Sequence, residues 1–119
     1  TGTTILTRWI VNILLKTKMK KEKIICSAIW FDDDIARSNQ NVFSGFVVAG
    51  LRHSDCFRTA SVFDPEYKYK KYRNEQGFLT SENRFVNRKE ALSIAISARQ
   101  VKKKELHNPL IGLFSEDLY

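Results

Sequence analysis

The chain has 119 residues, of which 43% are hydrophobic and 28% are charged, and it carries a formal net charge of +7. This length corresponds to one small domain. The composition excludes a disordered tail, a collagen-like chain and a membrane-spanning protein.

Most of the positive charge lies at the beginning of the chain. The first 23 residues hold six Lys and Arg side chains and one acid, so they account for +5 of the net charge. We interpret residues 1–18 as a basic leader upstream of a single ligand-binding domain at 19–119. The apolar run 5–15 is shorter than the roughly 20 residues that cross a bilayer, so we expect no membrane partner. The nearly balanced charge of the body argues against nucleic acid as a partner.

The chain contains two cysteines, Cys26 and Cys56, without the spacing of disulfide scaffolds or zinc ribbons. We therefore expect a reducing, cytoplasmic setting. Three consecutive carboxylates at 32–34 could hold a divalent ion, but neighbouring carboxylates in a loop are more often solvated. We expect neither a metal nor a cofactor.

Two β-strands are predicted at the start of the domain. Isoleucines and aromatic residues between Lys23 and Phe31 indicate a largely buried strand, and the acidic, polar run at 32–41 indicates a loop. A second strand is predicted from Val42 to Val48. The two strands are expected to form a hairpin.

A short helix is predicted after the second strand. Ser54 or Asp55 is a suitable N-cap residue, and Cys56, Ala60 and Phe63 recur at helical spacing. We expect these three apolar side chains to face the core.

The run from Tyr67 to Arg73 interleaves tyrosines with Lys and Arg. Such a composition serves proteins that bind single-stranded nucleic acid, in which the rings stack on bases and the cations neutralise phosphates. A solvated loop with partly packed tyrosines explains the same residues, and we favour that interpretation.

A tight hairpin is predicted next. Residues 76–80 and 84–86 form its two short strands, and Asn83 in the turn tolerates the positive φ that such turns require. The glycine at 77 allows another chain or a ligand to approach closely.

The longest helix follows the hairpin. Asn87 and Glu90 have the spacing of a capping box, with asparagine in place of serine. Apolar residues then recur on one helical face, which predicts a helix from Arg88 to Val101. The tail 107–119 is expected to dock on the body. Together these elements predict an α+β fold, an antiparallel sheet of about four to six strands flanked by two helices.

Flat apolar rings and positive charge come together at the hairpin and the start of this helix. Unpaired amides at a helix N-terminus attract phosphate, and Arg84 and Arg88 would add bidentate donors. Phe78 and Phe85 could stack on a nucleobase, with Thr80 on the same face of the strand as Phe78. In the alternative, both phenylalanines belong to the core and both arginines are surface charges.

A second candidate site lies between the second strand and the first helix, where Arg52 and His53 could face an anion. Cys56 could act as a nucleophile if His53 lay within hydrogen-bond reach, but Cys56 also suits the apolar side of its helix. The chain lacks a complete catalytic motif, so we expect no catalytic residues.

Several segments together resemble a family of small phage proteins. These segments are an early K-I-I-x-x-A-I strand, the R-H-x-D-C junction, Q-G-F-L-T followed by R-F-V-N-R-K-E-A-L, and the ending L-F-S-E-D-L-Y. Over residues 19–119 the chain resembles the Thoeris anti-defence proteins of the first type, which act as sponges for cyclic nucleotide immune signals. The resemblance implies a non-enzymatic homodimer or trimer of dimers in the cytoplasm of an infected bacterium.

The resemblance also implies the ligand. Such proteins hold cyclic ADP-ribose isomers between protomers without cleaving them, and some hold cyclic di- and trinucleotides. We place base stacking at Phe78 or Phe85 and phosphate contacts at Arg52, Arg84 and Arg88. Two other functions stay open: a nucleotide-processing enzyme and a small basic nucleic-acid-binding module.

Overall fold

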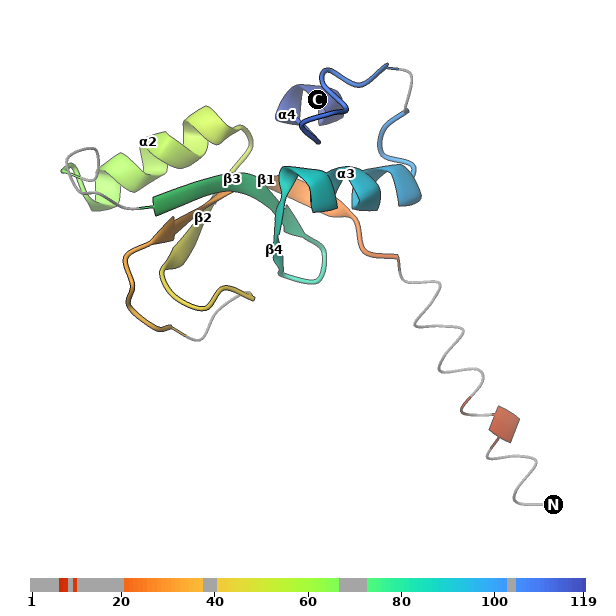
Figure 1. Cartoon of the computed structure of the whole chain (residues 1–119), viewed down its shortest axis with the longest axis horizontal. Helices are drawn as coiled ribbons and strands as arrows, with labels where there is room; N and C mark the ends of the chain where they lie inside the picture. Colours follow the sequence, from red (N-terminus) through yellow and green to blue (C-terminus); the bar gives the residue numbers. More distant parts are fainter. Residues whose placement is uncertain (1–6, 9, 11–20, 38–40, 67–72, 103–104) are drawn as a thin grey trace.

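A computed structural model describes residues 7–8, 10, 21–37, 41–66, 73–102 and 105–119. Four strands form one antiparallel sheet in the order β2-β1-β3-β4. Helices α2 and α3 cover the same face of this sheet, and the segment that ends in α4 lies over α3 (Figure 1). The predicted α+β fold is confirmed. The elements are β1 (Ile24–Asp32), β2 (Phe46–Gly50), α2 (His53–Phe63), β3 (Arg73–Thr80), β4 (Phe85–Asn87), α3 (Arg88–Ser97) and α4 (Ser115–Leu118).

The central strand β1 contributes to two hydrophobic clusters, one under each helix. Ile29 and Phe31 pack with Cys56 and Ala60 of α2. The cluster under α3 consists of Ile24, Phe78, Val86, Ala91, Ala95 and Leu113. Because side chains alternate along a strand, the opposite face of the sheet carries Trp30 and is not covered by α2 or α3.

The second strand begins later than predicted, at Phe46 instead of Val42. Gly45 adopts a φ of +80°, which only glycine reaches without strain, and the extended strand starts directly after it. Before the glycine, the side chain of Asn41 bonds both backbone groups of Phe85: Nδ2 donates to the carbonyl at 2.9 Å, and Oδ1 accepts from the amide at 2.8 Å. These bonds hold the loop before β2 against β4. The predicted pairing of the first two strands is confirmed.

Helix α2 begins at His53, with Arg52 as its N-cap residue instead of the predicted Ser54 or Asp55. Asp55 instead lies in the first turn, where its Oδ2 accepts a hydrogen bond of 3.1 Å from the Arg52 amide. Cys56 and Ala60 are buried as expected, but Phe63 is 84% exposed, so its predicted core position is wrong. The chain leaves the helix at Asp64, so Phe63 lies in the last turn, at the edge of the apolar hollow between α2 and the sheet.

The predicted hairpin between β3 and β4 is confirmed. Asn83 has a φ of +58°, and its amide donates to the Thr80 carbonyl at 2.9 Å. Strand β4 is short and pairs only with Gly77–Leu79. In the described part of the chain, the outer edge of residues 73–76 therefore has no neighbouring strand.

Helix α3 starts as predicted and ends early. Asn87 Oδ1 accepts from the Glu90 amide at 2.8 Å, which confirms the cap. The helix ends at Ser97 instead of Val101 because Arg99 turns into the left-handed region, with a φ of +58°. The amide of Gln100 then donates to Ala95 in a Schellman arrangement. This turn aims the Gln100 side chain at Ile24, whose amide and carbonyl it bonds at 2.8 and 2.7 Å.

The tail docks on the body, as the sequence predicts. Leu113 is fully buried, and its amide donates to the Arg88 carbonyl at 2.9 Å. The Tyr119 hydroxyl donates to the Ile25 carbonyl at 3.2 Å. Residues 67–72 of the predicted loop and almost all of the predicted leader lie outside the described residues. Arg73, the last residue of that predicted loop, instead begins β3, so the strand starts earlier than the predicted residue 76. Among the helices of the described residues, none has the length and hydropathy needed to span a membrane.

Candidate functional site

Arg84, a predicted phosphate ligand, is engaged inside the domain. Its Nε and Nη2 donate to the two carboxylate oxygens of Glu22, each at 2.7 Å. The Thr80 hydroxyl donates to the same carboxylate at 2.6 Å, and Thr80 is only 2% exposed. Both residues therefore join the segment before β1 to the hairpin, in a structural contact.

Phe78 and Phe85, the predicted stacking rings, belong to the interior. Phe78 is fully buried beneath α3, and Phe85 is 5% exposed. The Phe85 ring lies over Gly77 on the face of the sheet opposite the helices, 6.4 Å from the Trp30 ring. Neither ring offers an open face to a nucleobase.

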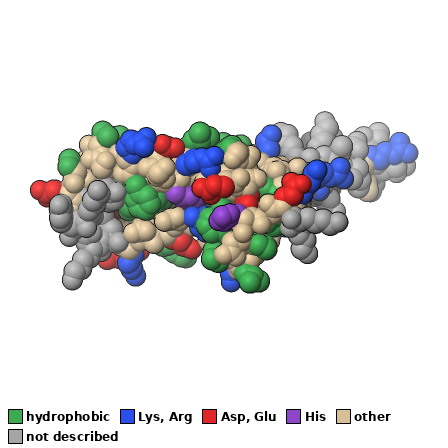
Figure 2. All heavy atoms as spheres, turned by 90° about the horizontal axis from the view of Figure 1, so that it is seen from above, with side chains coloured by type: hydrophobic (Ala, Val, Ile, Leu, Met, Phe, Trp, Pro, Cys, Tyr) green, Lys and Arg blue, Asp and Glu red, His purple; other side chains and the backbone are tan. Residues whose placement is uncertain are grey.

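Arg52 lies against the tail. Its Nη2 donates to the Tyr119 carbonyl at 3.1 Å, and its guanidinium lies 5.6 Å from the centre of the Tyr119 ring. Its Nη1 is 3.7 Å from Oε1 of Glu116. Figure 2, which views the molecule from the side of the helices, shows histidine side chains close to acidic and basic ones. The positive charge of Arg52 is therefore compensated within the chain, by the Tyr119 carbonyl and Glu116.

His53 and Cys56 do not form a nucleophile and base pair. The His53 Nε2 atom is 2.8 Å from the Gly77 carbonyl, and burial lowers the pKa of the ring. Cys56 is fully buried, and burial raises the pKa of its thiol to about 11. A reactive cysteine needs a lowered pKa and access to solvent, so Cys56 is better explained as a core residue.

The three consecutive carboxylates are held by arginines. Asp33 forms two hydrogen bonds of 2.9 Å with Arg37, and Arg73 bonds Asp32 at 2.9 Å and Asp34 at 2.7 Å. A hydrogen bond from the Ser44 hydroxyl lowers the pKa of Asp32, and hydrogen bonds from Arg37 lower the pKa of Asp33. Within the described ranges, no group of His, Cys, Asp and Glu residues could hold a metal ion.

Three hollows meet at Glu75 on β3, and we call them together the β3 groove. The Trp30 hollow has a volume of about 300 Å³, the Arg88 hollow about 240 Å³, and a smaller hollow beside Phe43 about 130 Å³. Glu75 lines all three. The groove forms where β4 ends at Asn87 and, among the described residues, no strand pairs with the outer edge of residues 73–76.

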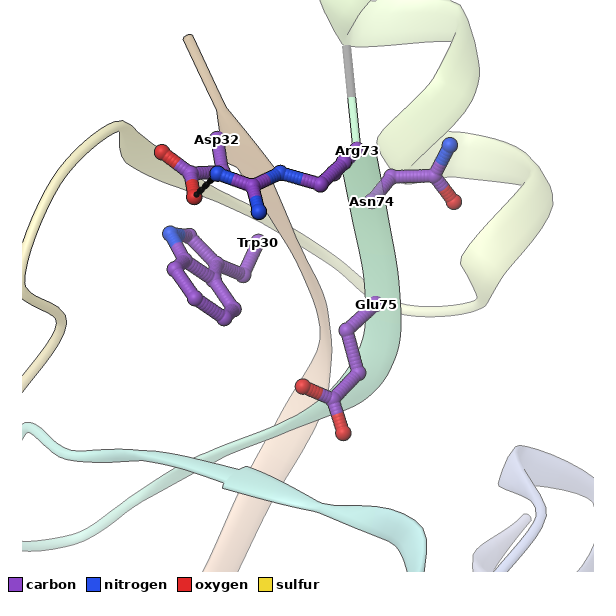
Figure 3. Close-up of a pocket in the computed structure, with 5 residues that line it drawn as sticks. All are labelled: Trp30, Asp32, Arg73, Asn74 and Glu75. Atoms are coloured by element: carbon purple, nitrogen blue, oxygen red, sulfur yellow. Dashed lines mark hydrogen bonds and ion pairs between the residues drawn. The ribbon is translucent and has the colours of Figure 1, made fainter. Parts of the chain in front are cut away.

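The Trp30 hollow offers an aromatic ring among hydrogen-bonding groups. Figure 3 shows the indole between the pair formed by Arg73 and Asp32 on one side and the carboxylate of Glu75 on the other. The indole Nε1 donates to the Ser44 carbonyl at 2.7 Å, which fixes the orientation of the ring. Such a partly buried, oriented ring can stack on a flat heterocycle.

Among the described residues, the Arg88 hollow has two cations and one acid in its lining, whereas in the Trp30 hollow Arg73 is bonded to Asp32 and Asp34. Arg88 and Lys89, at the start of α3, line the Arg88 hollow together with Gln76 and Ile111. Arg88 donates to Gln76 Oε1 at 2.6 Å and to the Leu113 carbonyl at 2.8 Å, and its guanidinium lies 4.3 Å from the centre of the Phe114 ring. These two bonds use two of the five N–H donors of a guanidinium, so donors remain for an anion.

The groove contains two of the residues that the sequence proposed, Phe85 in its wall and Arg88 at its cationic end. Trp30, Glu75 and Lys89 are residues of the groove that the sequence does not single out. The sequence predicts that Trp30 belongs to a largely buried strand, and a period-two count along that strand places it on the face opposite Ile29. Glu75 and Lys89 carry no local signal, because only the pairing of the strands brings them together.

The comparisons with known proteins identify a phage family. The family model described as Phage T4 y16D protein matches residues 23–119. Curated proteins give no match. Solved structures also give none. Since the matched segment extends from the residue before β1 to the last residue, the chain belongs to the family of the phage T4 y16D protein.

Proposed function

We propose that this phage protein is an anti-defence sponge, which captures a cyclic nucleotide immune signal and holds it without degrading it. The proposed ligands are glyco-cyclic ADP-ribose isomers and cyclic di- or trinucleotides. Membership of a phage family is consistent with this role. The resemblance to the Thoeris anti-defence proteins of the first type supports the class of ligand.

One observation supports nucleotide binding above all others. An oriented indole and two cations line hollows that adjoin at a single residue, Glu75. A nucleotide has the same two chemical ends, a flat base that stacks on aromatic rings and a phosphate that binds Arg and Lys. The base is therefore assigned to Trp30, and the phosphate to Arg88 and Lys89.

A second copy of the chain would deepen the binding. Sites for small ligands normally enclose most of the ligand surface, whereas the β3 groove is an open one. Val62 and Phe63 on α2 are 74% and 84% exposed, beside an apolar hollow of about 260 Å³. Among the described residues, the lining of this hollow has one acid and no Lys or Arg. Copies with a net charge of +7 repel each other least at such a patch, so we assign it to self-association.

The proposal is tested by calorimetric titration of the full chain with cyclic ADP-ribose, its glyco-cyclic isomers and 3′,5′-cyclic di-AMP. We expect saturable binding of at least one of these, and release of the unchanged ligand after heat denaturation, as measured by mass spectrometry. A chemically altered ligand would favour the nucleotide-processing enzyme. Absence of binding by all of them would overturn the proposal.

Two variants locate the site. Lys89→Glu is expected to weaken binding about tenfold or more, because it replaces an attraction to phosphate by a repulsion. Lys102→Glu makes the same change of charge at an exposed lysine beyond the other end of α3, and it is expected to leave affinity within about twofold. Equal losses in both variants would indicate a general electrostatic effect without a site.

A further inference from the structure

We infer that Glu75 recognises the ribose of the bound nucleotide, so that the protein selects ribonucleotide signals over their 2′-deoxy counterparts. This inference rests on the proposed function. It assigns a specificity-determining role to the carboxylate at which the three hollows meet.

The first support is the order of the chemical groups along the groove. Trp30 lies at one end, Glu75 at the junction, and Arg88 and Lys89 at the other end. In a nucleotide, the ribose connects the base to the phosphate. A ligand with its base on the indole and its phosphate on the cations therefore places a ribose at Glu75.

The second support is the state of the Glu75 side chain. Glu75 is exposed to solvent, and its carboxylate makes no ion pair or hydrogen bond with another described residue. Asp32, which also lines the Trp30 hollow, is already bonded to Arg73 and Ser44. Glu75 thus keeps its acceptor capacity for a ligand.

A carboxylate accepts hydrogen bonds and offers none, so it suits the donors of a ribose hydroxyl. Hydrogen bonds to charged groups are the stronger ones in proteins. The same carboxylate repels a phosphate at the junction, which disfavours ligands that enter in another register. Attraction and repulsion together fix which part of the nucleotide lies at Glu75.

The experiment compares matched ligands on matched variants by calorimetric titration. The probes are 3′,5′-cyclic di-AMP and cyclic ADP-ribose, each with its 2′-deoxy analogue. Wild type is expected to bind the ribose form about tenfold more tightly or better. Glu75→Gln is expected to reduce this preference to within about threefold. Glu82→Gln removes the same charge from an exposed acid in the hairpin turn, and it is expected to keep the full preference.

The outcomes separate the two levels of the proposal. Binding of a ribose probe without preference over its deoxy analogue would overturn the role of Glu75 and leave nucleotide capture standing. Loss of the preference in Glu82→Gln as well would also overturn it, because the effect would follow from net charge. If none of the probes binds, the role of Glu75 is overturned. Binding of a glyco-cyclic isomer would then still support the proposed function, and absence of that binding would overturn it too.

Discussion

Arg84 and Glu22 form a bidentate ion pair, in which two guanidinium nitrogens each lie 2.7 Å from a carboxylate oxygen. The pair joins the segment before β1 to the turn between β3 and β4. Because Arg84 is engaged in this pair, its role is to stabilise the fold. Arg88 and Lys89 are then the residues of the β3 groove that could bind an anion.

Replacing Arg84 with Ala is expected to destabilise the protein by about 1–2 kcal/mol and to leave nucleotide affinity unchanged. The estimate is modest because 40% of the Arg84 side chain is exposed. Urea unfolding measures the stability, and calorimetric titration measures the affinity. In a double-mutant cycle with Glu22→Gln, strictly additive effects would contradict the pair.

The same pair predicts a dependence of stability on pH. The hydrogen bond from Arg84 lowers the pKa of Glu22 in the folded state. The pair therefore stabilises the protein fully above the ordinary glutamate pKa of about 4.3, and this contribution is lost as pH falls through the lower folded value. The difference in unfolding free energy between wild type and Glu22→Gln should shrink towards zero below about pH 4. A difference that stays constant from pH 7 to pH 3 would contradict this assignment.

Gly77→Ala is expected to destabilise the protein by about 3 kcal/mol or more. A Cβ atom at this position would overlap the Val86 carbonyl oxygen and would lie 2.7 Å from Phe85 Cζ. Gly50→Ala serves as the control, because its Cβ meets nothing closer than 3.1 Å. Thermal unfolding of both variants checks the ranking, and an equal or larger loss in Gly50→Ala would contradict it.

The two cysteines are expected to differ in reactivity. Cys56 is fully buried with a pKa raised to about 11, whereas Cys26 is only partly buried. Iodoacetamide at pH 8 should therefore alkylate Cys26 before Cys56 in the folded protein, and both at similar rates in urea. Peptide mapping by mass spectrometry distinguishes the two sites. Preferential labelling of Cys56 would revive a nucleophilic role for it.

Phe63→Ser is expected to weaken self-association without weakening the fold. The ring is 84% exposed, so its loss should change the unfolding free energy by no more than about 0.5 kcal/mol. Light scattering coupled to size-exclusion chromatography measures the mass of the particle. Ile96→Ser on α3, at a side chain that is 38% exposed, is the control and should leave the mass unchanged. A wild-type protein that is monomeric at high concentration would refute the interface.

Local signals in the sequence predicted the elements well. The capping box of Asn87 and Glu90 and the turn at Asn83 are confirmed, because each depends on residues that are neighbours along the chain. The end of α3 was missed, since Arg99 adopts a conformation that usually belongs to glycine. That turn is stabilised by the bonds between Gln100 and Ile24, which lie 76 residues apart.

By itself the sequence determined the class of fold, the β3–β4 hairpin and the start of the long helix. The tertiary structure alone decided which side chains could form a site. An arginine bonds any acceptor within reach, and only the folded chain shows that Arg84 reaches Glu22 while Arg88 faces the groove. Likewise, Trp30 and Lys89 come to adjoining hollows because β3 pairs with β1 along its whole length and with β4 along only part of it.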